Sequence, residues 1–101
     1  MAMLALETLQ HSLFAPLVGE PFTLTSGEQS VALVLQQANL LGHKRSEAFR
    51  DPFSLLFRGP RGLRAPQGIY VFSHPSLGIM ECFMTQTGDG AQGSEFEVIF
   101  T

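Results

Sequence analysis

The sequence predicts a mainly β fold, in which about six antiparallel strands form a partly open barrel or a small sandwich with one N-terminal helix packed on it. Three observations lead to this fold class. Short runs of alternating apolar and polar residues recur from position 21 to the end of the chain. Turns rich in Gly and Pro separate these runs. No helical pattern of about 10–15 residues lies between successive runs, so parallel βαβ units are not expected.

A short helix is predicted over residues 3–14, and Pro16 and Gly19 end it. The apolar side chains of one helix face recur at intervals of three or four residues, at Met3, Leu6, Leu9 and Leu13. Such a stripe usually packs on the domain's own sheet, and we expect the same here. A helix that binds a partner is the alternative.

The strands are expected over residues 21–26, 31–41, 53–58, 69–74, 77–87 and 94–100. In the third strand, Phe53, Leu55 and Phe57 share one face, which we expect to point into the core. The second strand has Val, Leu and Ala on both faces, which predicts that both faces are covered.

The length and composition fit one domain, residues 1–101, with enough apolar material for a core. Cys82 is the single cysteine, so no internal disulfide is expected. The N-terminus lacks the basic start of a secretory signal, and no apolar run approaches the ~20 residues of a membrane helix. These features predict a soluble, cytoplasmic protein that does not bind membranes.

The charged residues are unevenly distributed along the chain, whose net charge is −3. All six basic residues lie between positions 44 and 64, where two acids leave a net charge of +4, whereas the remainder has seven acids and a net charge of −7. Two complementary surfaces favour head-to-tail contact between copies or docking on an acidic partner protein. The sequence therefore predicts a non-catalytic interaction or assembly module. Its partner-binding residues would be Lys44, Arg45, Arg50, Arg61 and Arg64, unless these charges only solvate two loops.

A small-molecule or anion binder, with a pocket inside the curled sheet, is the alternative function. The polar groups of that pocket would be Tyr70, His74 and Glu81. Glu81 shares a strand face with apolar residues, and its pKa would rise if that face were buried. The more ordinary outcomes are a pair with Arg58 or exposure at the sheet edge. His74, directly before Pro75, is expected to be a turn residue whose ring caps backbone groups.

No motif of the chain indicates an enzyme, a metal site or a cofactor. The three His residues lack the H-x-x-x-H spacing, and one Cys cannot start a structural zinc site. Cys82 stands in an apolar strand, where we expect an inert buried thiol. The loop from Gly59 to Arg64 lacks the phosphate-binding G-x-x-x-x-G-K-[ST] spacing. Nucleic-acid binding is not expected either, because most aromatic residues are predicted to face the core and the net charge is negative.

Several blocks of the sequence resemble those of a known family. They span most of the chain, at residues 17–24, 51–60, 66–70, 72–78 and 96–100. Together they are similar to a family of short bacterial proteins of about 100 residues, each little more than one domain of unknown function. The resemblance implies a bacterial or phage-like origin and a stand-alone domain, and it carries over no catalytic residue.

Overall fold

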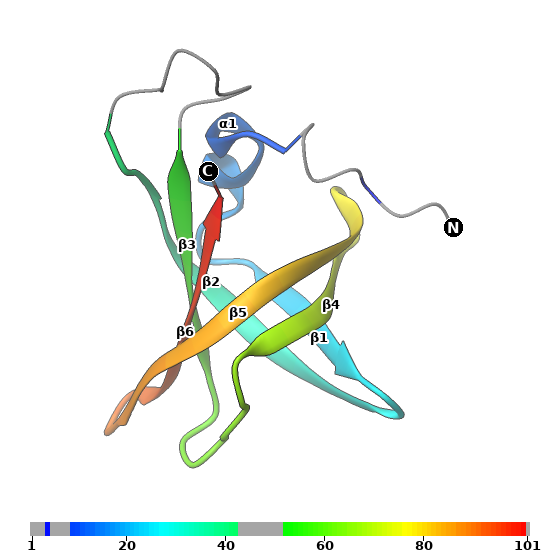
Figure 1. Cartoon of the computed structure of the whole chain (residues 1–101), viewed down its shortest axis with the longest axis vertical. Coiled ribbons are helices and arrows are strands. Elements are labelled where there is room, and N and C mark those ends of the chain that lie inside the picture. Colours follow the sequence, from blue (N-terminus) through cyan, green and yellow to red (C-terminus); the bar gives the residue numbers. More distant parts are fainter. Residues whose placement is uncertain (1–3, 5–8, 43–51, 101) are drawn as a thin grey trace.

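Six antiparallel strands close into a barrel in the order β1-β2-β3-β6-β5-β4 (Figure 1). The computed structural model describes residues 4, 9–42 and 52–100. The strands are β1 (Pro21–Ser26), β2 (Gln29–Leu40), β3 (Phe53–Gly59), β4 (Gly68–His74), β5 (Gly78–Gly90) and β6 (Gly93–Phe100). The predicted six-stranded antiparallel fold is confirmed, and of the two predicted architectures the chain adopts the barrel.

Two strands that are distant in sequence close the barrel. β1 pairs with β4 through contacts that include Leu24 opposite Phe72, in addition to its hairpin with β2. The closed ring leaves no unpaired strand edge among the six described strands. Strand ends differ by at most three residues from the expected ones. The largest differences arise at tight turns, 27–28 and 91–92, where the hairpins pair up to their tips.

Aromatic side chains fill the interior of the barrel. The fully buried ones come from α1 and from four strands: Phe14, Phe22, Phe53, Phe57, Phe72 and Phe96. Their rings pack directly on one another, with centroids 5.3 Å apart for Phe22 and Phe57 and 5.1 Å apart for Phe57 and Phe72. Barrels of about eight strands have an interior just wide enough for side chains or one small ligand, and this barrel has six strands. The rings occupy the centre of the described barrel, and the pocket inside the sheet stays a prediction.

The N-terminal helix is shorter than predicted. It consists of α1 (His11–Phe14) and the 3₁₀ turn η2 (Ala15–Leu17), and Gln10 before it is extended. Of the other predicted helical residues, 3 and 5–8 lie outside the described part. Leu4 is not helical, since its N–H donates to the carbonyl of Ile79 at 2.7 Å. The helix still covers one end of the barrel, as expected (Figure 1).

The buried side chain of this helix differs from the predicted one. Leu13 is 42% exposed, whereas Phe14 is fully buried and its ring lies 5.7 Å from that of Phe53. Leu9 of the predicted stripe is buried, but it precedes the helix. A phenyl ring buries more apolar area than Leu and adds ring contacts, so the aromatic cluster selects Phe14.

The outer face of β2 is open, contrary to the expectation of two covered faces. Leu33 and Leu35 point into the core, while Ala32 is exposed and Val34 half-buried. A closed barrel has one interior, and the buried residues of β2, Leu33 and Leu35, are alternate ones. Among the described residues, no helix has the length and apolar character needed to cross a membrane.

Candidate functional site

The β1–β2 hairpin, the β3–β4 loop (60–67) and the β5–β6 hairpin lie at the end of the barrel opposite α1, with the loop between the two hairpins (Figure 1). We call this end, residues 26–31, 60–67 and 89–93, the mouth. It contains two of the five predicted partner-binding residues, Arg61 and Arg64, and both are exposed. The other three, Lys44, Arg45 and Arg50, lie outside the described residues.

The β3–β4 loop is fixed to the C-terminal hairpin by hydrogen bonds. The Gly62 N–H donates to Asp89 Oδ1 at 3.1 Å, and the Ser94 hydroxyl donates to the Pro60 carbonyl at 2.8 Å. Gln86 binds the loop twice, because its Oε1 accepts from the Ala65 N–H at 3.1 Å and its Nε2 donates to the Leu63 carbonyl at 2.9 Å. The loop that carries both arginines is thus held in one conformation by side chains of β5 and β6.

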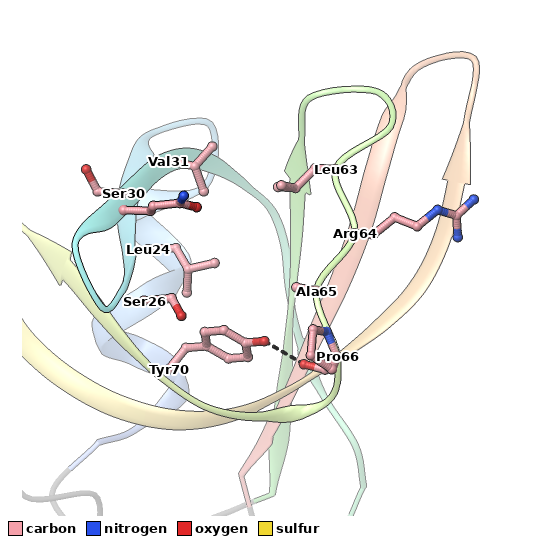
Figure 2. Close-up of a pocket in the computed structure, with 10 residues that line it drawn as sticks. Leu24, Ser26, Ser30, Val31, Leu63, Arg64, Ala65, Pro66 and Tyr70 are labelled. Atoms are coloured by element: carbon pink, nitrogen blue, oxygen red, sulfur yellow. Dashed lines mark hydrogen bonds between the residues drawn. The ribbon is translucent and has the colours of Figure 1, made fainter.

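A hollow of about 200 Å³ opens between the β1–β2 hairpin and the β3–β4 loop. Most of its wall surface is apolar and comes from Leu24, Val31, Leu63, Ala65, Pro66 and Tyr70. The polar residues Ser26, Gln29, Ser30 and Arg64 complete the lining. Figure 2 shows Leu24 and Val31 across from Leu63 and Ala65, with the Arg64 side chain pointing away from them. The Tyr70 hydroxyl donates to the Pro66 carbonyl at 2.6 Å, so its hydrogen is already used within the chain.

The size and lining of this hollow limit the kinds of group that it can bind. Sites for small molecules usually measure about 300–1,000 Å³ and contain several converging polar groups. A hollow of about 200 Å³ with mainly apolar walls suits one apolar or aromatic side chain better than a cofactor or an anion. Arg64 belongs to the lining, but its cationic group extends away from the hollow (Figure 2).

The basic and acidic residues are less separated in space than in sequence. Arg58 Nη2 lies 3.0 Å from Glu95 Oε1 across the β3–β6 pair. Arg61 lines the same shallow depression as Asp89. This proximity arises because β6 returns beside β3 and its hairpin with β5 supports the basic loop. The cations with no ion pair in the described part are Arg61 and Arg64.

The three predicted pocket residues are not brought together. Tyr70 lines the mouth, whereas His74 lies four residues further along β4, toward the end that α1 covers. Glu81 is exposed on the outer face of β5, opposite Val71 of β4. Arg58, its proposed partner, pairs with Glu95 instead. A carboxylate loses hydration on burial, and the aromatic interior offers it no compensating donor, so the outer face is the expected place for Glu81.

His74 caps the turn between β4 and β5. Its ring is buried, and Nδ1 accepts the N–H of Ser76 at 3.1 Å. An accepting Nδ1 leaves the ring proton on Nε2, which lies 2.7 Å from Glu20 Oε1. The ring of Phe22 packs beside the imidazole, at a centroid distance of 4.8 Å. His74 thus has a structural role at the turn, and all of its ring nitrogens have partners.

Cys82 points into the core between Met80 and Met84 and is 2% exposed. Burial, and secondarily the negative charge of Glu81, raises the pKa of its thiol from 9.0 to about 12. Between pH 9 and about 12, the thiol of the folded protein therefore keeps its proton, whereas the same thiol in the unfolded chain releases it. It follows that the stability linked to this proton is present below pH 9 and is lost as the pH rises toward about 12.

We expect Cys82 to resist thiol reagents in the folded protein, because a buried, protonated thiol is a poor nucleophile. Labelling with a chromogenic disulfide at mildly alkaline pH should be slow in buffer and fast after addition of denaturant. Rapid labelling of the native protein would place this face of β5 outside the barrel.

In the described residues, no three His, Cys, Asp or Glu side chains lie close enough to hold a metal ion.

Sequence analysis missed an apolar surface on the outside of the barrel. Ile69, Phe83 and Ile99 are 70%, 54% and 55% exposed. The alternation along β5 contained the signal, because Phe83 lies on the same strand face as Glu81 and on the opposite face from Cys82. Only one face of each strand can enter a closed barrel, and on β5 the face with Met80, Cys82 and Met84 does so.

Comparison with known proteins gives one match. No curated protein and no solved structure matches the chain. The family model described as Domain of unknown function (DUF6916) matches residues 9–100, which include α1 and all six strands. The resemblance to a family of unknown function is thereby confirmed. The chain belongs to the DUF6916 family.

Proposed function

We propose that this chain is a non-catalytic interaction or assembly module, acting in the cytoplasm of a bacterial or phage-like system. The observation that supports it best is the mouth, where a mainly apolar hollow for one side chain is lined by the exposed Arg64, on the loop that also carries the exposed Arg61. The partner that fits is an acidic protein surface with a protruding aromatic or aliphatic residue. The bacterial or phage-like setting rests on the sequence blocks described above.

Three features of the molecule favour binding over catalysis. The interior is filled by aromatic rings, so a substrate would have to bind at the mouth. There the hollow is small, and its lining includes the hydroxyl groups of Ser26, Ser30 and Tyr70. The Tyr70 hydroxyl is already bonded to Pro66. The β3–β4 loop is held in place before a partner arrives, which lowers the entropy cost of association.

The test is the affinity of the mouth for a short fluorescent peptide with one Phe between Glu residues. We expect Arg61→Gln with Arg64→Gln to weaken binding roughly 2- to 30-fold, since each exposed ion pair contributes about 0.2–1 kcal/mol. Fluorescence anisotropy at low salt measures the dissociation constant. Added salt should weaken the wild-type complex, because the contact is screened.

Two controls separate a specific contact from a general effect of charge. Gln10→Glu with Ser12→Glu removes the same net charge at the α1 end, where both residues are exposed, and should leave the affinity unchanged. A peptide with Lys in place of Glu should bind weakly. Equal affinities for the two double variants, or for the two peptides, would contradict the proposed function.

A further inference from the structure

Three exposed apolar side chains form a continuous stripe on the outer face of β4, β5 and β6. Ile69 lies directly opposite Phe83 in the β4–β5 register. Met84 pairs with Val98, which places Ile99 of β6 beside Phe83 of β5. Scattered apolar residues are ordinary on a protein surface, but contiguous ones on neighbouring strands mark a contact surface. We call Ile69, Phe83 and Ile99 the outer stripe.

The charges beside the outer stripe are negative. Glu81 precedes Phe83 by two residues on the same face of β5, and Glu97 has the same relation to Ile99 on β6. Both carboxylates lie at the surface, Glu81 exposed and Glu97 half-buried. The chain's six basic residues all lie between positions 44 and 64, and the described ones are on β3 and the mouth. The stripe is thus an apolar surface with an acidic border.

We infer that the outer stripe of one copy docks on the mouth of a second copy, head to tail; this inference rests on the proposed function of the mouth. The two surfaces are complementary in chemistry. Phe83 is the aromatic side chain that the hollow between Leu24 and Leu63 would take. Glu81 and Glu97 would then face Arg61 and Arg64 of the other copy.

A symmetric contact of stripe against stripe is the less favourable arrangement. It would gather the Glu81 and Glu97 carboxylates of both copies around one apolar centre, with no cation from either stripe. Like charges at an interface disfavour association, whereas opposite charges steer it. A head-to-tail contact leaves a free mouth and a free stripe at its two ends, so it extends into a ring or a filament.

The contact is expected to be weak and to depend on concentration. Stable protein interfaces bury about 800 Å² on each side, with roughly 20–30 residues. The outer stripe and the hollow together present fewer residues than this. We therefore expect the average mass of the wild-type protein to rise with concentration at low salt and to fall when salt is added.

Complementation between two variants is the decisive experiment. Phe83→Glu removes the stripe but keeps the mouth, while Arg61→Glu with Arg64→Glu removes the mouth but keeps the stripe. By sedimentation velocity, each variant alone should remain at the monomer mass of 11.0 kDa. An equimolar mixture should form a dimer of twice that mass and nothing larger, because it contains one intact pair of surfaces.

Leu13→Glu is the matched control, an equally apolar-to-acidic change at an exposed residue of α1, and it should associate as the wild type does. Thermal unfolding confirms that each variant is folded, and Ile69→Glu replaces Phe83→Glu if that variant is not. The inference would be overturned if Phe83→Glu associated as the wild type does, or if the mixture of the two variants stayed monomeric. If the inference fails in this way but the mouth binds the acidic Phe peptide, the proposed function stands without self-association. If the peptide does not bind either, the inference and the proposed function both fail.

Discussion

Replacement of Phe57 by alanine is expected to lower the free energy of unfolding by about 3–5 kcal/mol. Phe57 is fully buried at the centre of the barrel, where its ring contacts those of Phe22 and Phe72. Two effects add up to this loss. The variant buries less apolar area on folding, and the missing ring leaves a cavity that the closed sheet cannot fill by moving inward. Domains of this size have a total stability of about 5–15 kcal/mol, so this change removes a large share of it.

Thermal unfolding measures this effect directly. A loss of about 3–5 kcal/mol corresponds to a fall in melting temperature of roughly 12–40 °C for a domain near 100 residues. Phe83→Ala is the matched control, because it makes the same chemical change on the outside of the barrel. We expect that variant to lose less than about 1 kcal/mol. Similar losses for both variants would mean that inside and outside are wrongly assigned.

Gly93→Ala is expected to destabilise the protein by about 2–6 kcal/mol, the sum of backbone strain and overpacking. Gly93 has φ +123°, a conformation that residues with a Cβ rarely adopt. A Cβ at this position would also collide with the carbonyl oxygen of Gly59, at the end of β3. Backbone cannot move away as a flexible side chain would, so β3 and β6 would have to separate at the mouth.

The neighbouring hairpin glycine provides the control for this prediction. Gly90 pairs with Gly93, and a Cβ added to it would meet nothing within 4 Å. Gly90→Ala should therefore change stability by less than about 1 kcal/mol in denaturant unfolding. We also expect Gly93→Ala, but not Gly90→Ala, to weaken peptide binding, since the β3–β4 loop rests on this hairpin. Equal stability of the two variants would contradict the close approach of β3 and β6.

The strands were predictable because alternation is a local signal. Phe53, Leu55 and Phe57 lie at alternate positions of one strand, and all three are buried as expected. Closure of the barrel was not predictable, because the paired residues of β1 and β4 are 46–50 positions apart and nothing local specifies their pairing. The buried side chain of the helix was also missed, since Leu13 and Phe14 are adjacent apolar residues and only the ring cluster decides between them.

The candidate site was predictable in part. The run of basic residues singled out Arg61 and Arg64, which the structure places on an anchored loop at the mouth. The hollow beside them was not predictable, because it forms between Leu24 and Leu63 from segments far apart in sequence. The run of basic residues also did not reveal which acidic residues lie near it. Asp89 and Glu95 come close to this segment only when β6 pairs with β3.

The most direct test of the account is where the acidic Phe peptide binds. Methyl-labelled protein reports this by NMR, because Leu24, Val31 and Leu63 line the hollow, while Leu40 is exposed on β2 away from it. Addition of the peptide at low salt should shift the methyl signals of the three hollow residues and leave Leu40 unchanged. Signals that shift elsewhere while those three stay fixed, or a spectrum that does not change at all, would contradict binding at the mouth.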